Sequence, residues 1–243
     1  KEGINMDKKQ SRRNFLKASS LFTLVGASAP SMVFAHTHNQ NNLNSTQNYR
    51  ARIFFNNSAQ LDILSEAVER IFPEDDLGPG AKKLGVAIFI DNELAGNYGS
   101  GAKDYRFGPF IQGKKNQGYQ YPLTRAELFK MGVNALDEEA KLRYKKSFIE
   151  LNAKQKDEVL RAFEQDKTKV SFGDKIKASD FFTELRSMTI AGVYADPIYG
   201  GNANMHAWRM KKFPGAQMTY AAQVLDGDKF EVIEPISLAD MSH

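Results

Sequence analysis

The stretch TRAELFKMGVNALDEEAKLRY, residues 124–144, carries a clear helical pattern. Thr124 and Glu127 have the spacing of a capping box, in which each side chain bonds to a backbone N–H at the start of a helix. The apolar residues that follow supply one face of a helix: Leu128, Met131, Val133, Leu136 and Leu142. The stretch therefore predicts a long amphipathic helix with one buried face.

Segments on both sides of this helix repeat the pattern. Ser58 is the expected cap of a helix that ends before Pro73, and three more helices are expected over 81–94, from Asn152 onward, and over 178–194. No alternation of strand, turn and helix appears along the chain. The expected fold class is mostly α: a single irregular helical domain with long loops rich in glycine and aromatic residues, and an extended C-terminal arm.

Two loop segments interrupt the helical pattern. Residues 95–121 combine many glycines with aromatic residues, and residues 196–216 carry turns and the only tryptophan. Residues 230–240, with apolar side chains around Pro235, are expected to form the arm. Aromatic side chains of long loops either fold back into the core or anchor a partner. We predict a partner interface at Tyr105, Phe107, Phe110, Tyr199, Trp208 and Phe213, with Trp208 mattering more for assembly than for folding.

Charge and composition limit the function. The chain has 243 residues, 42% hydrophobic and 26% charged, as in an ordinary soluble domain. Its net charge is +4, but residues 1–35 hold six basic and two acidic side chains, and the rest carries 27 of each. A neutral body argues against nucleic-acid binding, which depends on phosphate neutralisation. The absence of cysteine excludes disulfides, thiolate nucleophiles and cysteine-ligated zinc, haem or iron–sulfur groups in this sequence.

The N-terminal segment has the pattern of an export signal. Residues 11–17 read Ser-Arg-Arg-Asn-Phe-Leu-Lys, and a weakly apolar stretch from 18 to 34 follows, too short and too polar for a spanning helix. The segment resembles a twin-arginine signal peptide, which implies export of an already folded protein to the periplasm. Its signal residues are Arg12, Arg13, Phe15 and Leu16, with Ala35 at the end of the expected cleavage site.

These features predict three parts of the chain. A signal peptide covers residues 1–35, with Met6 as the expected start and residues 1–5 as an upstream extension. A polar, asparagine-rich linker covers 36–50, and the helical domain covers 51–243. The linker histidines, His36 and His38, have no third ligand beside them and do not predict a metal site.

The helical domain offers few candidates for catalysis. His206 lies ten residues after Asp196, so the two could form a general-base pair, although a structural imidazole is favoured. Gly96, Gly99 and Gly101 do not match the dinucleotide-binding fingerprint. The acidic run at 74–76 is expected to complement the dipole of a following helix. We predict no catalytic, cofactor-binding or metal-binding residue.

A series of motifs, in order, matches one family. They are IFPEDDLGPG at 71–80, GVAIFID at 85–91, LAG at 94–96, YRFGPF at 105–110, PLTRAE at 122–127 and DPIYGGN at 196–202, followed by Trp208 and FPGA at 213–216. In these motifs and their spacing, from about residue 58 to 240, the chain resembles the gluconate 2-dehydrogenase subunit 3 family.

The resemblance implies a small, non-catalytic subunit of a periplasmic, membrane-associated dehydrogenase. In such complexes a large flavoprotein of the glucose-methanol-choline type binds FAD and oxidises the sugar or sugar acid. A multihaem cytochrome c subunit often accepts the electrons, so haem c is expected in a third subunit and no cofactor in this chain. The small subunit carries the twin-arginine signal for the translocase, and its flavoprotein partner is exported with it.

The twin-arginine route carries folded proteins, commonly with a cofactor or a partner already bound. This chain has no evident cofactor site, so its signal is explained if the chain binds another protein. Two other function classes stay open. One is a self-sufficient periplasmic enzyme that uses His206, and the other is a solute-binding protein. The substrate of the complex stays open among gluconate, glucose and related polyols.

Overall fold

The computed structural model describes residues 52–111, 114, 117–173, 176–219 and 233–241. The described residues all belong to the unit that covers residues 45–243, and residues 1–44 lie outside them. The predicted export signal also lies outside the described residues: Arg12, Arg13, Phe15, Leu16 and Ala35, together with His36 and His38 of the linker.

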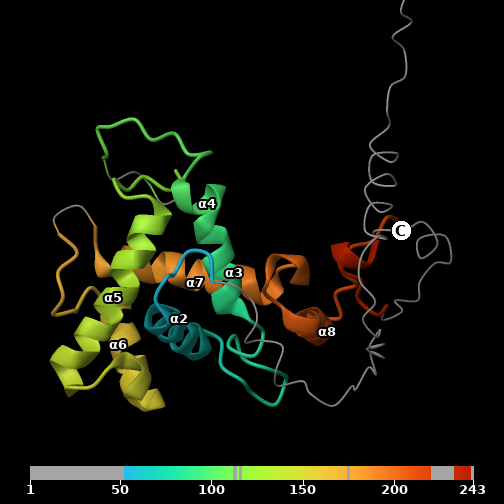
Figure 1. Cartoon of the computed structure of the whole chain (residues 1–243), viewed down its shortest axis with the longest axis horizontal. Coiled ribbons are helices and arrows are strands. Elements are labelled where there is room, and N and C mark those ends of the chain that lie inside the picture. The colour runs from blue at the N-terminus through green and yellow to red at the C-terminus, as the bar shows by residue number, and fades with distance from the viewer. Residues whose placement is uncertain (1–51, 112–113, 115–116, 174–175, 220–232, 242–243) are drawn as a thin grey trace, which may run out of the picture. The chain divides into compact units, whose positions relative to one another are not determined.

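The described part is helical and contains no β-strand, which confirms the mostly α fold class (Figure 1). Its α-helices are α2 (Ser58–Ile71), α3 (Val86–Ala95), α4 (Asn97–Ser100), α5 (Arg125–Tyr144), α6 (Ala153–Glu164), α7 (Ala178–Tyr194) and α8 (His206–Met210). Its 3-10 helices are η2 (Phe148–Glu150), η3 (Pro197–Tyr199), η4 (Ala203–Met205) and η5 (Leu238–Met241). None of the helices in the described ranges combines the length and the apolar character that a bilayer crossing requires.

The predicted capping box of α5 is present. The Glu127 N–H donates to Thr124 Oγ1 at 3.2 Å, and the Thr124 N–H donates to Glu127 Oε2 at 2.7 Å. These two bonds satisfy backbone donors that have no partner inside the helix. Asn152 and Gln155 make the same reciprocal pair at the start of α6. The starts of both helices are therefore fixed by local sequence.

Three boundaries differ from the sequence prediction. Asn57, not Ser58, caps α2, because its side chain accepts the Ala59 N–H at 2.9 Å while Ser58 is already helical. The second helix begins at Val86, not at 81, since Gly85 adopts a left-handed φ of 76° that ends the preceding turn. Part of the expected loop at 95–121 is helical, as α4.

The core lies between α2, α3, α5, α6 and α7. Phe129 of α5 meets Phe181 of α7 edge to face, with ring centroids 5.6 Å apart. Gly132 allows these two helices to approach, because a Cβ at this position would lie 2.2 Å from the Phe181 ring. The fully buried large side chains of the core include Phe55, Phe129, Phe148, Phe163, Phe181, Leu64, Leu84, Leu128, Leu136 and Leu185.

The first described residues are bound to α3 through a buried carboxylate. Asp91 is fully buried and accepts backbone N–H groups from Ile53 at 2.7 Å, Phe54 at 3.2 Å and Phe55 at 2.8 Å. Burying a charge is costly unless hydrogen bonds satisfy it, and three N–H donors do so here. The segment that follows the linker is thereby held against the helical body.

Asp196 connects the C-terminal arm to the end of α7. Its carboxylate accepts the Ser237 hydroxyl at 2.7 Å, the Leu238 N–H at 2.8 Å and the Ile198 N–H at 3.0 Å. Burial alone would raise the pKa of the Asp196 carboxyl, but these donors lower it below its usual range. Ile236 of the arm also forms an isolated parallel β-bridge with Gly215, and the arm ends in η5. Residues 230–232, the first of the expected arm, lie outside the described part.

Candidate functional site

The segment between α4 and α5 presents large apolar side chains to solvent. We call residues 102–111 the aromatic loop; Figure 1 shows this segment, in green, extending away from the helices. Tyr105 is 85% exposed, Phe107 79% and Ile111 70%, and the Tyr105 and Phe107 ring centroids lie 5.4 Å apart. Clustered apolar exposure of this kind is typical of interaction sites, and the predicted interface role of Tyr105 and Phe107 remains a prediction.

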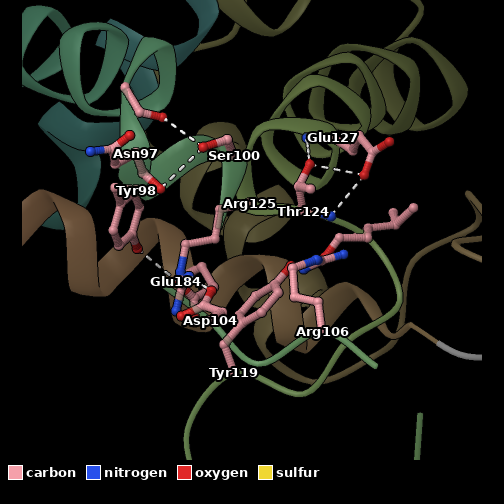
Figure 2. A network of polar contacts seen from close by, with 12 residues as sticks. Asn97, Tyr98, Ser100, Asp104, Arg106, Tyr119, Thr124, Arg125, Glu127 and Glu184 are labelled. Carbon is pink, nitrogen blue, oxygen red and sulfur yellow. Dashed lines mark hydrogen bonds and ion pairs between the residues drawn. The ribbon is translucent and has the colours of Figure 1, made fainter. Parts of the chain in front are cut away.

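Arg125, the first residue of α5, holds the base of this loop. Its guanidinium lies between two rings, 4.6 Å from the Tyr98 centroid and 4.2 Å from the Tyr119 centroid (Figure 2). It pairs with Asp104 of the loop, and its Nε lies 3.5 Å from Glu184 Oε2 on α7. The Arg125 side chain is only 15% exposed. We call these five residues the arginine hub.

The electrostatics of the arginine hub fix its protonation states. Burial would lower the pKa of the Arg125 guanidinium, but the bond to Asp104 raises it. The Tyr98 hydroxyl donates to Glu184 Oε2 at 3.1 Å, and burial and the Glu184 charge raise the pKa of Tyr98. At neutral pH the hub thus holds a charged arginine and neutral tyrosines. A cation between two ring faces is stabilised by their quadrupoles, the more so when water is excluded.

Further bonds fix the loop and its return limb, residues 117–123. Arg106 donates to the carbonyls of Pro122 at 2.9 Å and Leu123 at 3.2 Å. The Tyr119 hydroxyl also donates to the Leu123 carbonyl, at 2.8 Å. The Tyr121 hydroxyl donates to Asp180 Oδ1 of α7 at 2.8 Å. The loop that carries the exposed side chains is therefore held to α5 and α7 by hydrogen bonds and ion pairs at its base.

A hollow of about 390 Å³ lies beside the loop base. Its lining joins α3 and α4 to the loop and includes Asn92, Asn97, Lys103 and Arg125. Asn92 also donates through Nδ2 to the Tyr199 carbonyl of η3, at 3.1 Å. Tyr199, one of the predicted anchors of the C-terminal segment, therefore lies next to Asn92 in the lining of the hollow but does not line the hollow itself.

The comparison with known families identifies the chain. A family model described as gluconate 2-dehydrogenase subunit 3 matches residues 58–215, more than half of the sequence. The chain belongs to the gluconate 2-dehydrogenase subunit 3 family. The match runs from the first residue of α2 past α8, and it includes the aromatic loop and the arginine hub. The comparisons with curated proteins and with solved structures gave no match.

The predicted interface residues of this subunit 3 chain occupy different environments. Tyr105 and Phe107 are highly exposed on the loop, and Phe110, half-buried, lies with its ring 6.0 Å from the Arg106 guanidinium. Tyr199 and Phe213 are about half exposed. Their role in an interface stays a prediction. Sequence reasoning missed Ile111, Ile198 and Met218, exposed apolar side chains that it could have found in the same loop and C-terminal segments.

Trp208 differs from the expectation of an assembly anchor. It is 6% exposed, its Nε1–H donates to the Tyr194 carbonyl at 2.9 Å, and its ring meets Phe213 with centroids 5.3 Å apart. An indole that is buried with its N–H satisfied contributes to the fold. The structure therefore places Trp208 in the packing of the subunit 3 body, and we expect it to matter first for stability.

Trp208→Phe is expected to lower the free energy of unfolding by about 2 kcal/mol, because it removes a buried hydrogen bond and leaves unfilled volume. Urea unfolding followed by circular dichroism measures the change. Phe213→Leu, at a half-exposed position in contact with the same ring, is the matched control, with an expected loss of about 0.5 kcal/mol. An unchanged midpoint for Trp208→Phe would contradict the structural role.

The structure separates the two residues considered for general-base catalysis. The Asp196 carboxylate accepts hydrogen bonds from η3 and from the arm, whereas His206 begins α8 and makes no hydrogen bond with Asp196 among the described residues. The described residues also contain no group of three or more histidine, aspartate or glutamate side chains arranged for a metal ion.

The acidic run at 74–76 does not lie at a helix start. α3 begins only at Val86, so the expected dipole interaction is wrong. Asp75 instead accepts the Leu77 N–H at 2.8 Å within a turn, and Glu74 pairs with Lys83 at 2.6 Å. These charges stabilise a surface turn of the subunit 3 chain.

Proposed function

We propose that this chain is the non-catalytic small subunit of a periplasmic, membrane-associated, FAD-dependent complex of the gluconate 2-dehydrogenase type. It binds the flavoprotein subunit, which holds FAD and oxidises a sugar or sugar acid. It supports the folding and assembly of that subunit and its export by the twin-arginine translocase. A multihaem cytochrome c is the expected third subunit.

The proposal rests on family membership, since the family model matches the chain from α2 to α8. A subunit 3 chain is by its family a component of a gluconate 2-dehydrogenase complex. The aromatic loop supports the binding role, since exposed tyrosine and phenylalanine side chains on a fixed base are typical interface anchors. A fixed base lowers the entropy that is lost on association. The twin-arginine pattern at residues 11–17 supports the export role.

Co-expression of the full chain with the flavoprotein subunit encoded with it tests the proposal. We expect the two to co-purify, with the flavin absorbance in the flavoprotein, and the periplasmic flavoprotein to fall to background when the chain is omitted. The chain purified alone is expected to show neither turnover nor flavin absorbance.

The rival functions predict other results. Turnover by the purified chain would favour a self-sufficient enzyme, and a melting temperature raised by a sugar acid would favour a solute-binding protein. A flavoprotein that reaches the periplasm normally without the chain would overturn the export role.

A further inference from the structure

We infer that the aromatic loop is the element that docks on the flavoprotein subunit, and that it enters an apolar recess with an acidic rim. This inference rests on the proposed function, because it names the surface of that same complex. Tyr105, Phe107 and Ile111 are the apolar anchors. Lys103 and Lys114, which flank them, are the charged contacts.

The apolar part of the surface is concentrated on the projecting segment. The three anchor side chains are each at least 70% exposed, and the rings of Tyr105 and Phe107 already lie against each other. A buried aromatic side chain contributes roughly 150–250 Å² to an interface. The loop alone therefore supplies a large share, and not the whole, of the roughly 800 Å² that each partner buries in a standard interface.

The remaining area has a natural source next to the loop. The hollow of about 390 Å³ adjoins Lys103 and Asp104, and Asn92 links it to the half-exposed Tyr199. A protein partner can place a polar side chain into such a hollow and continue onto Tyr199. A flat lipid surface cannot fill it, so the shape of this region favours a protein over a membrane.

The charge of the loop defines the chemistry of the recess. Asp104 is its only acidic residue, and Arg125 neutralises it. Arg106 donates to two backbone carbonyls, and its charge also acts on Glu127 at the start of α5. No ion pair joins Lys103 or Lys114, both exposed, to a carboxylate within the described ranges. On a body that is neutral overall, this local surplus is complementary to an acidic rim, which would steer association and make it depend on salt.

The experiment uses the full chain and the purified flavoprotein subunit, with affinity measured by biolayer interferometry at low and at high salt. The test variants are Tyr105→Ser/Phe107→Ser, which removes two anchors, and Lys103→Glu/Lys114→Glu, which reverses the loop charge. The matched controls are Leu142→Ser/Ile149→Ser, at exposed apolar positions near the other end of α5, and Lys146→Glu/Lys154→Glu, which makes the same change of charge elsewhere. Thermal melting confirms that each variant folds.

We expect both test variants to weaken binding about 30-fold or more at low salt, and both controls to stay within about twofold of the wild type. At high salt the charge-reversal defect should shrink strongly, because screening weakens exposed charge pairs, whereas the defect of the anchor variant should persist.

Other outcomes overturn the inference and separate it from the proposed function. If the wild type binds the flavoprotein and both test variants bind equally well, the loop is not the docking element, although the proposed function stands. If the wild type does not bind the flavoprotein, both the inference and the proposed function are overturned. Sedimentation with phosphatidylglycerol and phosphatidylethanolamine vesicles completes the test: vesicle binding that only the loop variants lose, with flavoprotein affinity unchanged, would make the loop a membrane contact instead.

Discussion

Arg125→Ala is expected to lower the free energy of unfolding by about 3 kcal/mol and to detach the aromatic loop from α5. The substitution removes a cation that lies between the rings of Tyr98 and Tyr119. It also leaves Asp104 and Glu184, both mostly buried, without their counter-charge. An uncompensated buried charge costs more than the ion pair contributes, so the loss exceeds that of an exposed arginine.

Two measurements separate the global effect from the local one. Urea unfolding gives the change in stability, and hydrogen exchange of the loop amides reports whether residues 102–111 open independently of the helices. Arg125→Lys is the matched control. It keeps the charge and loses the planar group that stacks on two rings, so an intermediate loss of about 1–2 kcal/mol is expected.

The result also bears on docking. If the arginine hub orders the loop before association, Arg125→Ala should weaken flavoprotein binding even at temperatures where the body stays folded, since ordering must then occur on binding. A variant with unchanged exchange rates in the loop and an unchanged unfolding midpoint would show that the hub does not position this segment.

Much of the helical framework could be predicted because its determinants are local. α5 and α6 begin with reciprocal caps whose partners lie three residues apart, and α7 has the bounds that its apolar periodicity indicates. α3 was placed too early because apolar periodicity continues through residues 81–85. Only the left-handed backbone of Gly85 shows that a turn intervenes.

The site was less predictable because its contacts join distant segments. In the sequence, nothing distinguishes Arg125 from other residues at the start of a helix with a capping box. Its partners come from α4, the aromatic loop, the return limb and α7. The same limit applies to Trp208, whose burial depends on Tyr194 and Phe213. Composition indicated that the loops are rich in aromatic residues, but it could not tell which rings turn inward and which face solvent.

The N-terminal segment of the helical body links the fold to the proposed export route. The backbone N–H groups of Ile53, Phe54 and Phe55 donate to the Asp91 carboxylate of α3. These bonds tie the first described residues to the folded core. The proposed export signal at residues 11–17 has a direct test of its own.

Arg12→Lys/Arg13→Lys is expected to reduce the periplasmic fraction of this chain from most of the protein to background, while the folded body accumulates in the cytoplasm. The paired arginines are the defining feature of the twin-arginine signal, and lysine keeps the charge without the planar guanidinium. If the chain escorts the flavoprotein, that subunit must be retained with it. Cell fractionation with detection of both subunits measures the effect.

Lys8→Arg/Lys9→Arg, a conservative change of two neighbouring basic residues, is the matched control and should leave export unchanged. Co-purification from the cytoplasm shows whether the retained pair still assembles, which separates loss of export from loss of binding. Export of the double lysine variant at the wild-type level would exclude the twin-arginine route. Retention of the chain alone, with the flavoprotein still reaching the periplasm, would remove the escort role and leave only the role of a bound subunit.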